Sequence, residues 1–200
     1  MVTVPAGSDA KQPRFVIDAL RAGDTDAIDQ AAALLVEAFP HWLPTMELAR
    51  DEVMQALETD RICLVARAGD QILGWVGAIP EYSHAWELHP LVVRADARRQ
   101  GLGAALVRAL EERVREVGAL TLYLGTDDDR PAAGTSAGGV ELFPDVLSHA
   151  MGLRVIDHPA GFYSRMGFQV VGLIPDANGL GKPDILMAKR VNGAIRPPRG

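Results

Sequence analysis

Residues 91–104 combine the residue types that bind phosphate groups. A strand pattern ends in a turn that carries Arg98 and Arg99, and a helix pattern then opens with Gly101 and Gly103. Glycines let a ligand approach the backbone, and the first turn of a helix offers unpaired N–H donors and about half a positive charge. Two guanidinium groups add cationic donors suited to phosphate oxygens. This stretch predicts a pyrophosphate site, although short glycine patterns also open helices that bind nothing.

The pattern Arg98-x-x-Gly101-x-Gly103 resembles the acetyl-coenzyme A pyrophosphate loop of the GNAT N-acetyltransferases. Longer strings in matching order are similar to the aminoglycoside 6'-N-acetyltransferase branch of that family. These strings are Trp86-Glu87-Leu88-His89-Pro90-Leu91-Val92-Val93, Tyr123-Leu124-Gly125-Thr126-Asp127-Asp128, His158-Pro159, Phe162-Tyr163 before Gly167-Phe168, and Asn178-Gly179 with Lys182-Pro183-Asp184-Ile185. The resemblance covers residues 15–190. It departs in the first 13 residues and in the first helices, which face the substrate in that family.

The resemblance implies an enzyme that transfers acetyl from acetyl-coenzyme A to a primary amine. The first choice of acceptor is the 6'-amine of an aminoglycoside, with antibiotic resistance as the role, and the family also implies a homodimer. No metal is expected. The expected acetyl-coenzyme A contacts are Leu91, Val92, Val93, Arg98, Arg99, Gln100, Gly101, Leu102, Gly103 and Ala104.

Acetyl transfer to an amine needs a neutral amine, a donor to the developing oxyanion and a proton for the departing thiolate. Pro90 lacks an N–H, so a bulge or a splayed strand is expected there. That distortion would leave the N–H of Leu91 for the thioester carbonyl and the N–H of Val93 for the pantetheine amides. By the resemblance, Glu87 positions or deprotonates the amine, directly or through water, and Tyr163 protonates the thiolate. By residue type alone, Glu87 could equally be a surface carboxylate and Tyr163 a packed aromatic.

Acidic residues gather between residues 120 and 150, where five carboxylates accompany a single base, Arg130. A carboxylate cluster at a strand end suits a polycationic amine, although aspartates are also common in loops and caps. The resemblance makes Asp127 the first expected substrate contact and Asp128 the second. The further expected substrate contacts, each with simple packing or exposure as its alternative, are Trp42, Glu87 and His89.

The elements that must position these residues follow from hydrophobic period and capping residues. Helices are expected from Asp24 or Thr25 to Ala38, after Thr45, over 101–117, and in short stretches near 143–151 and 161–166. Strands are expected at 15–17, 62–66, 72–79, 86–93, 120–124, 169–174 and 185–188. This order predicts an α/β protein, and with the resemblance a GNAT fold, in which helices flank a mixed central β-sheet with splayed strands. We interpret 1–13 as a disordered tail, 14–191 as one acetyltransferase domain and 192–200 as a C-terminal tail.

Composition excludes several other classes. The chain has 200 residues and a formal net charge of −6, which fits one domain and is unlike a general nucleic-acid binder. Cys63 is the only cysteine, which excludes an intrachain disulfide and a Cys-based zinc site and argues against a covalent acyl-enzyme. Apolar runs are too short to cross a bilayer, and the first residues lack the apolar run of a secretory signal. A cytoplasmic protein without nucleic-acid or membrane partners is therefore expected.

Other motifs suggest competing functions. Gly134-Thr135-Ser136-Ala137-Gly138 matches the nucleophile elbow of hydrolases, with Asp157 and His158 following in hydrolase order, but no strand directly precedes it. Gly179-Leu180-Gly181-Lys182 is similar to part of an NTPase phosphate loop, but Pro183 stands where Ser or Thr is needed. Within the GNAT interpretation, the alternatives are an acetyltransferase of a polyamine or protein amine and a module that binds coenzyme A without turnover.

Overall fold

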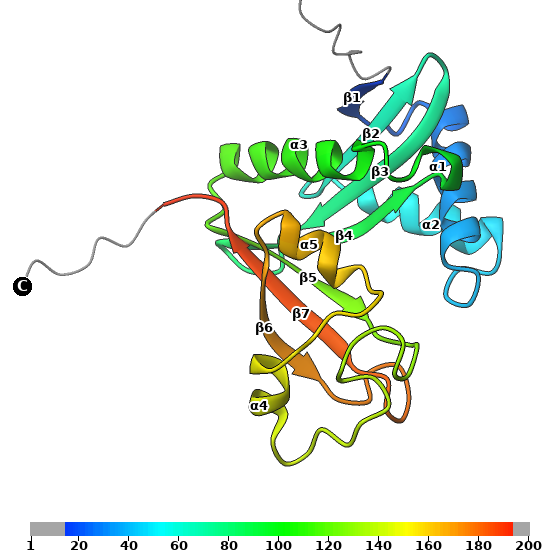
Figure 1. The fold of residues 1–200 in the computed structure, drawn as a ribbon. Helices are drawn as coiled ribbons and strands as arrows, with labels where there is room; N and C mark the ends of the chain where they lie inside the picture. The colour runs from blue at the N-terminus through cyan, green and yellow to red at the C-terminus, as the bar shows by residue number, and fades with distance from the viewer. Residues whose placement is uncertain (1–14, 194–200) are drawn as a thin grey trace, which may run out of the picture.

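The computed structural model describes residues 15–193, so the expected N-terminal tail and most of the expected C-terminal tail lie outside the described residues. Seven strands form one sheet in the order β1-β2-β3-β4-β5-β7-β6 (Figure 1). Only β4 and β5 are parallel; the other neighbours are antiparallel. The predicted mixed sheet is confirmed. The strands are β1 (Val16–Ala19), β2 (Ile62–Ala68), β3 (Gln71–Ile79), β4 (Ala85–Val93), β5 (Thr121–Asp127), β6 (Gln169–Ile174) and β7 (Asp184–Arg190).

Helices cover both faces of this sheet. α1 (Thr25–Ala38) and α2 (Met46–Ala56) pack against one face, in a core that includes the fully buried Trp75 of β3. α3 (Leu102–Glu116) packs its apolar stripe against the other face. The short α4 (Val146–Met151) contacts β6, and α5 (Ala160–Arg165) contacts β7. The predicted helices all form, and a 3₁₀ turn at Ala95–Ala97 was not predicted.

Two helix starts follow from their capping residues. The carboxylate of Asp24 accepts a hydrogen bond from the N–H of Ala27 at 3.2 Å, and the hydroxyl of Thr45 accepts one from Leu48 at 3.3 Å. Such side chains satisfy N–H groups that the first helical turn leaves without a partner. Both predicted starts are therefore confirmed.

The sheet splays between β4 and β5. The two strands pair only from Ala85 to Glu87, against Thr121 to Tyr123, and Figure 1 shows them diverging beyond that point. The pairing of β3 with β4 also shifts by one residue, so that His89 and Pro90 together oppose Gly77. A Cβ atom on Gly77 would overlap the carbonyl oxygen of His89, so the bulge needs a glycine there. The distortion predicted at Pro90 is confirmed.

Several strands are longer than their sequence pattern predicts, and the extensions of β5 and β7 bear on the site. β5 was expected to end at Leu124 but continues to Asp127, and β7 begins at Asp184 rather than Ile185. The reason is mutual pairing, because every residue from Thr121 to Asp127 has a partner on β7. Ladder hydrogen bonds thus override the low strand propensity of glycine and aspartate. As a result, Asp127 lies at the end of a strand.

Candidate active site

A cavity of about 530 Å³ opens where β4 and β5 diverge. Its walls come from the end of α1, the loop after it, β4, the ends of β5 and β7, and α5. Six residues predicted for the site are brought together here from distant parts of the chain. They are Trp42, Glu87, His89, Leu91, Asp127 and Tyr163.

Carboxylates dominate the charge of this cavity. Glu87 comes from β4, Asp127 and Asp129 from the end of β5 and the loop after it, and Asp184 from the start of β7. Among the described residues, no lysine or arginine lines the cavity. Uncompensated negative charge at a cavity wall attracts and holds cations.

Asp184 is the acidic residue that the sequence prediction missed. Its Oδ1 atom is buried without a hydrogen-bond partner in the described part of the chain, and its carboxylate covers Gly125 so closely that a Cβ there would overlap it. Burial, followed by the negative charge of Asp127, raises the pKa of Asp184. Gly125 inside a strand was the available signal, because such a glycine often marks a close approach by another group.

Asp128 does not face the cavity, and its prediction as a substrate contact is corrected. The residue is fully buried, and its Oδ2 accepts hydrogen bonds from the N–H and the hydroxyl of Thr135 at 3.0 and 2.6 Å. Gly134 and Gly138 pack directly on the same carboxylate, where side chains would overlap it. Asp128 therefore organises the loop after β5, the alternative role that aspartates have in turns.

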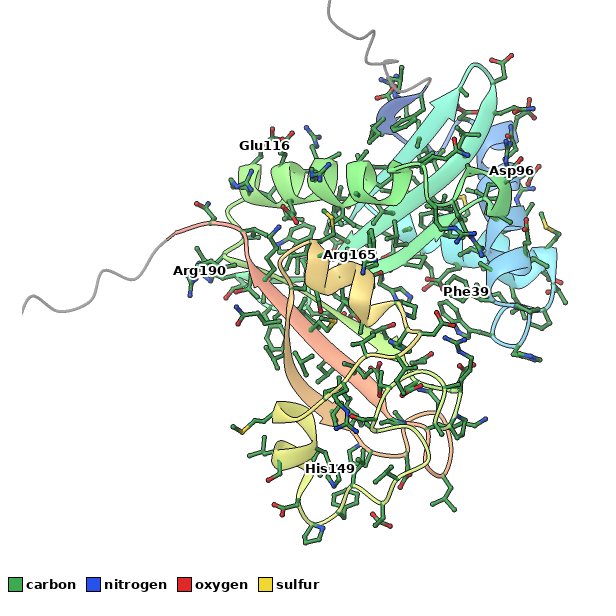
Figure 2. All side chains as sticks on the ribbon, in the orientation of Figure 1. Phe39, Asp96, Glu116, His149, Arg165 and Arg190 are labelled. Atoms are coloured by element: carbon green, nitrogen blue, oxygen red, sulfur yellow. The ribbon has the colours of Figure 1, made fainter. Side chains whose placement is uncertain are left out.

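Aromatic side chains form another part of the cavity wall. Trp42 is 48% exposed and packs edge-on against Phe39 and His89, with ring centroids 5.8 and 5.4 Å apart. Figure 2 labels Phe39, which lies beyond the end of α1 and was not predicted as a site residue. His89 also has its Nε2 3.4 Å from a carboxylate oxygen of Glu52 in α2. The ring of His89 is thus held between Trp42 and Glu52, and Trp42 remains accessible to a ligand.

Tyr163 and Glu87 reach the cavity from two sides. Tyr163 is 9% exposed, and burial raises its pKa above the ordinary phenol value, so it carries its proton at neutral pH. Glu87 lies opposite Tyr123 in the β4–β5 pairing, and burial together with the charge of Glu87 raises the pKa of Tyr123 to about 12. A phenol that holds its proton can act as an acid, and a carboxylate can act as a base.

The backbone of β4 presents N–H groups to the splayed gap. The N–H of Arg94 donates to Leu73 of β3 at 2.8 Å, and donors alternate in direction along an antiparallel strand. The N–H groups of Leu91 and Val93 therefore point away from β3, toward the side from which β5 has diverged. The prediction that Val92 contacts acetyl-coenzyme A is corrected, because its N–H faces β3 and its side chain is buried under α1 and α2.

The start of α3 offers a run of free backbone donors. Within the described residues, none of the N–H groups from Arg99 to Ala104 has a protein acceptor. Gly101 adopts a left-handed φ of 83°, and nothing lies within 4 Å of the position that a Cβ would take. Arg98 donates from Nε to the carbonyl of Val93 at 3.0 Å, so its guanidinium is anchored beside this run. Of the other predicted residues, Leu102 has its side chain in the core and offers only its backbone.

The alternative hydrolase motif is not assembled. The hydroxyl of Ser136 accepts a hydrogen bond from the N–H of Arg154 at 3.0 Å. The ring of His158 instead bonds the carbonyl of Asp127 and the N–H of Ala160. Cys63 is buried, and burial raises the pKa of its thiol to about 12, which leaves it a poor nucleophile.

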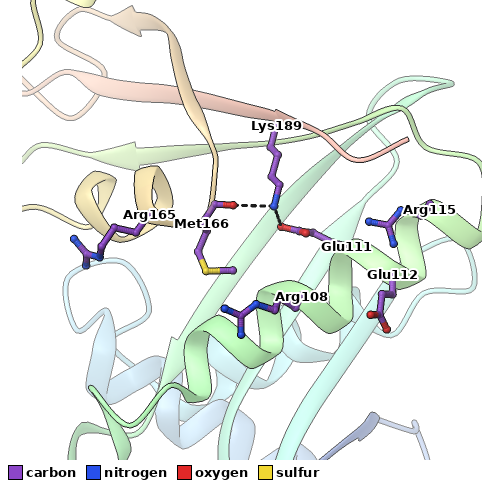
Figure 3. Close-up of a pocket in the computed structure, with 7 residues that line it drawn as sticks. All are labelled: Arg108, Glu111, Glu112, Arg115, Arg165, Met166 and Lys189. Atoms are coloured by element: carbon purple, nitrogen blue, oxygen red, sulfur yellow. Dashed lines mark hydrogen bonds and ion pairs between the residues drawn. The ribbon is translucent and has the colours of Figure 1, made fainter. Parts of the chain in front are cut away.

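A second cavity, of about 360 Å³, lies between α3, α5 and β7. Figure 3 shows Lys189 between the carboxylate of Glu111 and the carbonyl of Met166, at 2.6 and 2.8 Å. Arg108, Arg115 and Arg165 surround this pair together with Glu112. Four basic and two acidic side chains line this cavity, and it holds none of the predicted catalytic residues.

Neither a metal site nor a membrane-spanning helix is found within residues 15–193. No group of three or more His, Cys, Asp and Glu side chains in this range could hold a metal ion. No helix in the same range combines the length and apolar character needed to span a membrane.

Comparison with known proteins gives a consistent set of relatives. Residues 28–134 match the model of the acetyltransferase (GNAT) family. A crystal structure of an aminoglycoside 6'-N-acetyltransferase complexed with coenzyme A is 34% identical, with a TM-score of 0.84, and the match covers 90% of this chain and 99% of that one. The aminoglycoside 6'-N-acetyltransferase from Enterococcus faecium is similar at the same identity and coverage, with a TM-score of 0.82. The predicted resemblance is confirmed.

A curated relative is more distant. N-acetyltransferase 8B of Rattus norvegicus is 30% identical over 111 residues, which make up 46% of this chain and 46% of that protein. The chain thus spans less than half the length of this curated relative.

Proposed function

This chain belongs to the acetyltransferase (GNAT) family, and from that premise we propose that it acetylates the 6'-amine of aminoglycosides with acetyl-coenzyme A. The observation that carries the acceptor class is the cavity wall of four carboxylates without lysine or arginine among its described residues. Aminoglycosides are polycationic amines, and the similar structures at 34% identity are aminoglycoside 6'-N-acetyltransferases. Antibiotic resistance is the role we propose. The homodimer and the cytoplasmic location remain predictions of the resemblance.

The described residues fit coenzyme A at the start of α3. A pyrophosphate needs several donors and positive charge, and the free N–H groups from Arg99 to Ala104 supply the donors. The guanidinium groups of Arg98 and Arg99 supply charge, and the bare backbone at Gly101 leaves room for close approach. The N–H of Val93 is available for a pantetheine amide. Acetyl-coenzyme A supplies a thioester that reacts with an amine.

Three groups of this chain act on the reacting atoms in the proposed mechanism. Glu87 accepts a proton from the acceptor ammonium, directly or through one water, so that the nitrogen gains a free electron pair. The N–H of Leu91 donates to the oxygen that becomes negative as the C–N bond forms. Tyr163 gives its proton to the sulfur as the C–S bond breaks, and the nitrogen loses its second proton to water. Solvent then reprotonates Tyr163 and takes up the proton held by Glu87. The products are an acetamide and a free thiol.

The remaining carboxylates hold the acceptor in place. Asp127 and Asp184 stand on paired strand ends, so their charges lie side by side and are not neutralised by a basic residue of the cavity. An aminoglycoside carries several ammonium groups, of which only one reacts. The others can pair with these carboxylates while Trp42 covers an apolar face of the sugar.

A thiol-release assay tests the proposal. The purified chain with acetyl-coenzyme A is offered kanamycin, a matched aminoglycoside with a 6'-hydroxyl in place of the amine, spermidine, and a lysine peptide. We expect turnover with kanamycin and none with the 6'-hydroxyl compound. Turnover confined to spermidine or the peptide would reject the aminoglycoside assignment. Thiol release that does not depend on an acceptor, or no thiol release with any of the four compounds, would reject the assignment as an acetyltransferase.

A further inference from the structure

His158 makes two hydrogen bonds that join the carboxylate wall of the cavity to α5. Its Nε2 lies 2.8 Å from the carbonyl oxygen of Asp127, and its Nδ1 accepts the N–H of Ala160 at 3.1 Å. Because Nδ1 accepts a hydrogen bond it carries no proton, so the ring N–H is on Nε2 and donates to Asp127. The two partners thus select one neutral tautomer.

The two ends of this bridge are residues of the reaction site. Asp127 ends β5 and lines the cavity, and its carboxylate also accepts a hydrogen bond from Asn178 at 2.8 Å. Ala160 begins α5, and Tyr163 follows it by three residues within the same short helix. The residue before α5, Pro159, makes no side-chain capping bond, so His158 supplies the acceptor that the first turn needs.

We propose that His158 is a positioning residue that sets the place of Tyr163 relative to Asp127, and so aligns proton donor and bound acceptor. The inference rests on the proposed function, because it takes Asp127 as an acceptor contact and Tyr163 as the proton donor. His158 itself lies outside the cavity lining.

Neighbouring contacts do not perform the same task. Arg130 pairs with Asp157 at 3.0 Å, and the carbonyl of Gly134 accepts from the N–H groups of Ile156 and Asp157. These bonds join the loop after β5 to the segment before α5. None of them reaches Asp127 or any residue of α5, so the role of His158 is separable from the folding of this loop.

Two amide variants each keep one of the two hydrogen bonds of His158 and lose the other. Glutamine can place an N–H near the position of Nε2, so His158→Gln keeps the bond to Asp127 and loses the one to Ala160. Asparagine can place an oxygen near the position of Nδ1, so His158→Asn keeps the bond to Ala160 and loses the one to Asp127. His149→Gln is the matched control, since His149 lies on α4, far from α3 in Figure 2, and does not line the cavity.

Steady-state kinetics with kanamycin should separate the two variants. We expect kcat of His158→Gln to fall about tenfold with the kanamycin KM nearly unchanged, because a small displacement of the proton donor slows the reaction. We expect the kanamycin KM of His158→Asn to rise about tenfold with kcat nearly unchanged, because only the acceptor contact moves. KM for acetyl-coenzyme A should stay the same in both. Wild-type kinetics in both variants, or equal losses of the same parameter, would overturn the proposal.

A nuclear magnetic resonance measurement separates this inference from the proposed function. In the wild-type protein without substrate, the ¹⁵N shifts of His158 should report the Nε2–H tautomer. The amide of Ala160 should exchange about tenfold faster in His158→Gln and at the wild-type rate in His158→Asn, since only the first variant loses its acceptor. If these results hold and no aminoglycoside is acetylated, the proposed function fails while the bridge stands. The Nδ1–H tautomer, or unchanged exchange of the Ala160 amide in His158→Gln, would contradict the hydrogen-bonded bridge itself.

Discussion

The two cavities described above differ in the sign of the charge that lines them. Between α3, α5 and β7, four basic side chains accompany two carboxylates, and Lys189 pairs with Glu111 at 2.6 Å. Between the splayed strands, four carboxylates line the cavity, and no described lysine or arginine joins them. The first lining therefore has an excess of positive charge, whereas the second has an excess of negative charge. Only the second lining suits a cationic amine, so the sign of the excess charge distinguishes the proposed acceptor site.

The largest effect should come from removing Glu87, the proposed base of the carboxylate cavity. Glu87→Gln should lower kcat for kanamycin about 100-fold at neutral pH, because a positioned general base contributes on that scale. KM for acetyl-coenzyme A should not change, since the cofactor contacts lie on α3 and the far part of β4. Glu112→Gln in the other cavity is the matched control and should keep wild-type kinetics. Equal losses in the two variants would erase the distinction between the cavities.

The Lys189–Glu111 ion pair in the other cavity should contribute to stability instead of activity. Lys189→Met leaves the carboxylate of Glu111 with little solvent and no partner, so the free energy of unfolding should fall by about 2 kcal/mol, less than for a fully buried pair because Lys189 is partly exposed. Urea unfolding measures this change. The double variant Glu111→Leu with Lys189→Met should recover most of the loss, because it removes both charges. A double variant as unstable as the sum of two singles would mean that the ion pair is not the cause.

Removing the proposed proton donor, Tyr163, should have a smaller effect than removing the proposed base. Tyr163→Phe keeps the ring in the core and removes the hydroxyl, and kcat should fall about tenfold, below the usual range for general acids because thiolate is a good leaving group. KM for acetyl-coenzyme A should be nearly unchanged. Tyr82→Phe, at an exposed tyrosine outside the cavity, serves as the control. Unchanged turnover in Tyr163→Phe would remove this residue from the mechanism.

The smallest effects are expected at Asp184, where one substitution should weaken kanamycin binding but stabilise the fold. Asp184→Asn should raise the kanamycin KM about fivefold, roughly the loss of one charge pair that solvent still partly screens. The same variant should be slightly more stable than the wild type at neutral pH, because it removes a buried charge and its repulsion by Asp127. Asp60→Asn, at an exposed aspartate that does not line the cavity, controls for net charge.

The sign of the pH dependence follows from the raised pKa of Asp184. The folded state holds this proton at a higher pH than the unfolded chain does, so the wild type gains stability as the pH falls from neutral through the folded-state pKa. The stability advantage of Asp184→Asn should therefore shrink on acidification, as measured by thermal unfolding between pH 7 and pH 4. An advantage that grows on acidification would contradict the assignment of a raised pKa.

Much of the fold could be predicted because its signals are local. Asp24 and Thr45 cap the helices that they precede, and the apolar stripe of α3 faces the sheet. Strand ends were less predictable, since the extension of β5 to Asp127 depends on hydrogen bonds from β7, some 60 residues away in sequence. The free backbone donors at the start of α3 were also predictable, because the glycines and the helix start are contiguous in the sequence.

Side-chain direction was the part that sequence reasoning could not resolve. Asp127, Asp128 and Asp129 are chemically identical neighbours, yet the outer two line the cavity and the middle one is buried against Thr135. Likewise Val92 separates Leu91 and Val93 in the chain but turns its N–H to β3. The direction of each side chain or N–H depends on how its strand or loop is aligned with the neighbouring strands. That alignment is established by strand pairing.

The sequence by itself determined the family, the donor-rich start of α3 and the excess of acid after β5, because these reside in contiguous residue types. The tertiary structure decided which acids share a cavity, since Glu87, Asp127 and Asp184 meet only when β4 splays from β5 and β7 pairs with β5. It also decided that Lys189 neutralises Glu111 instead of reaching those acids. Electrostatic interactions act through space over a few ångströms, so their pairing is a property of the fold.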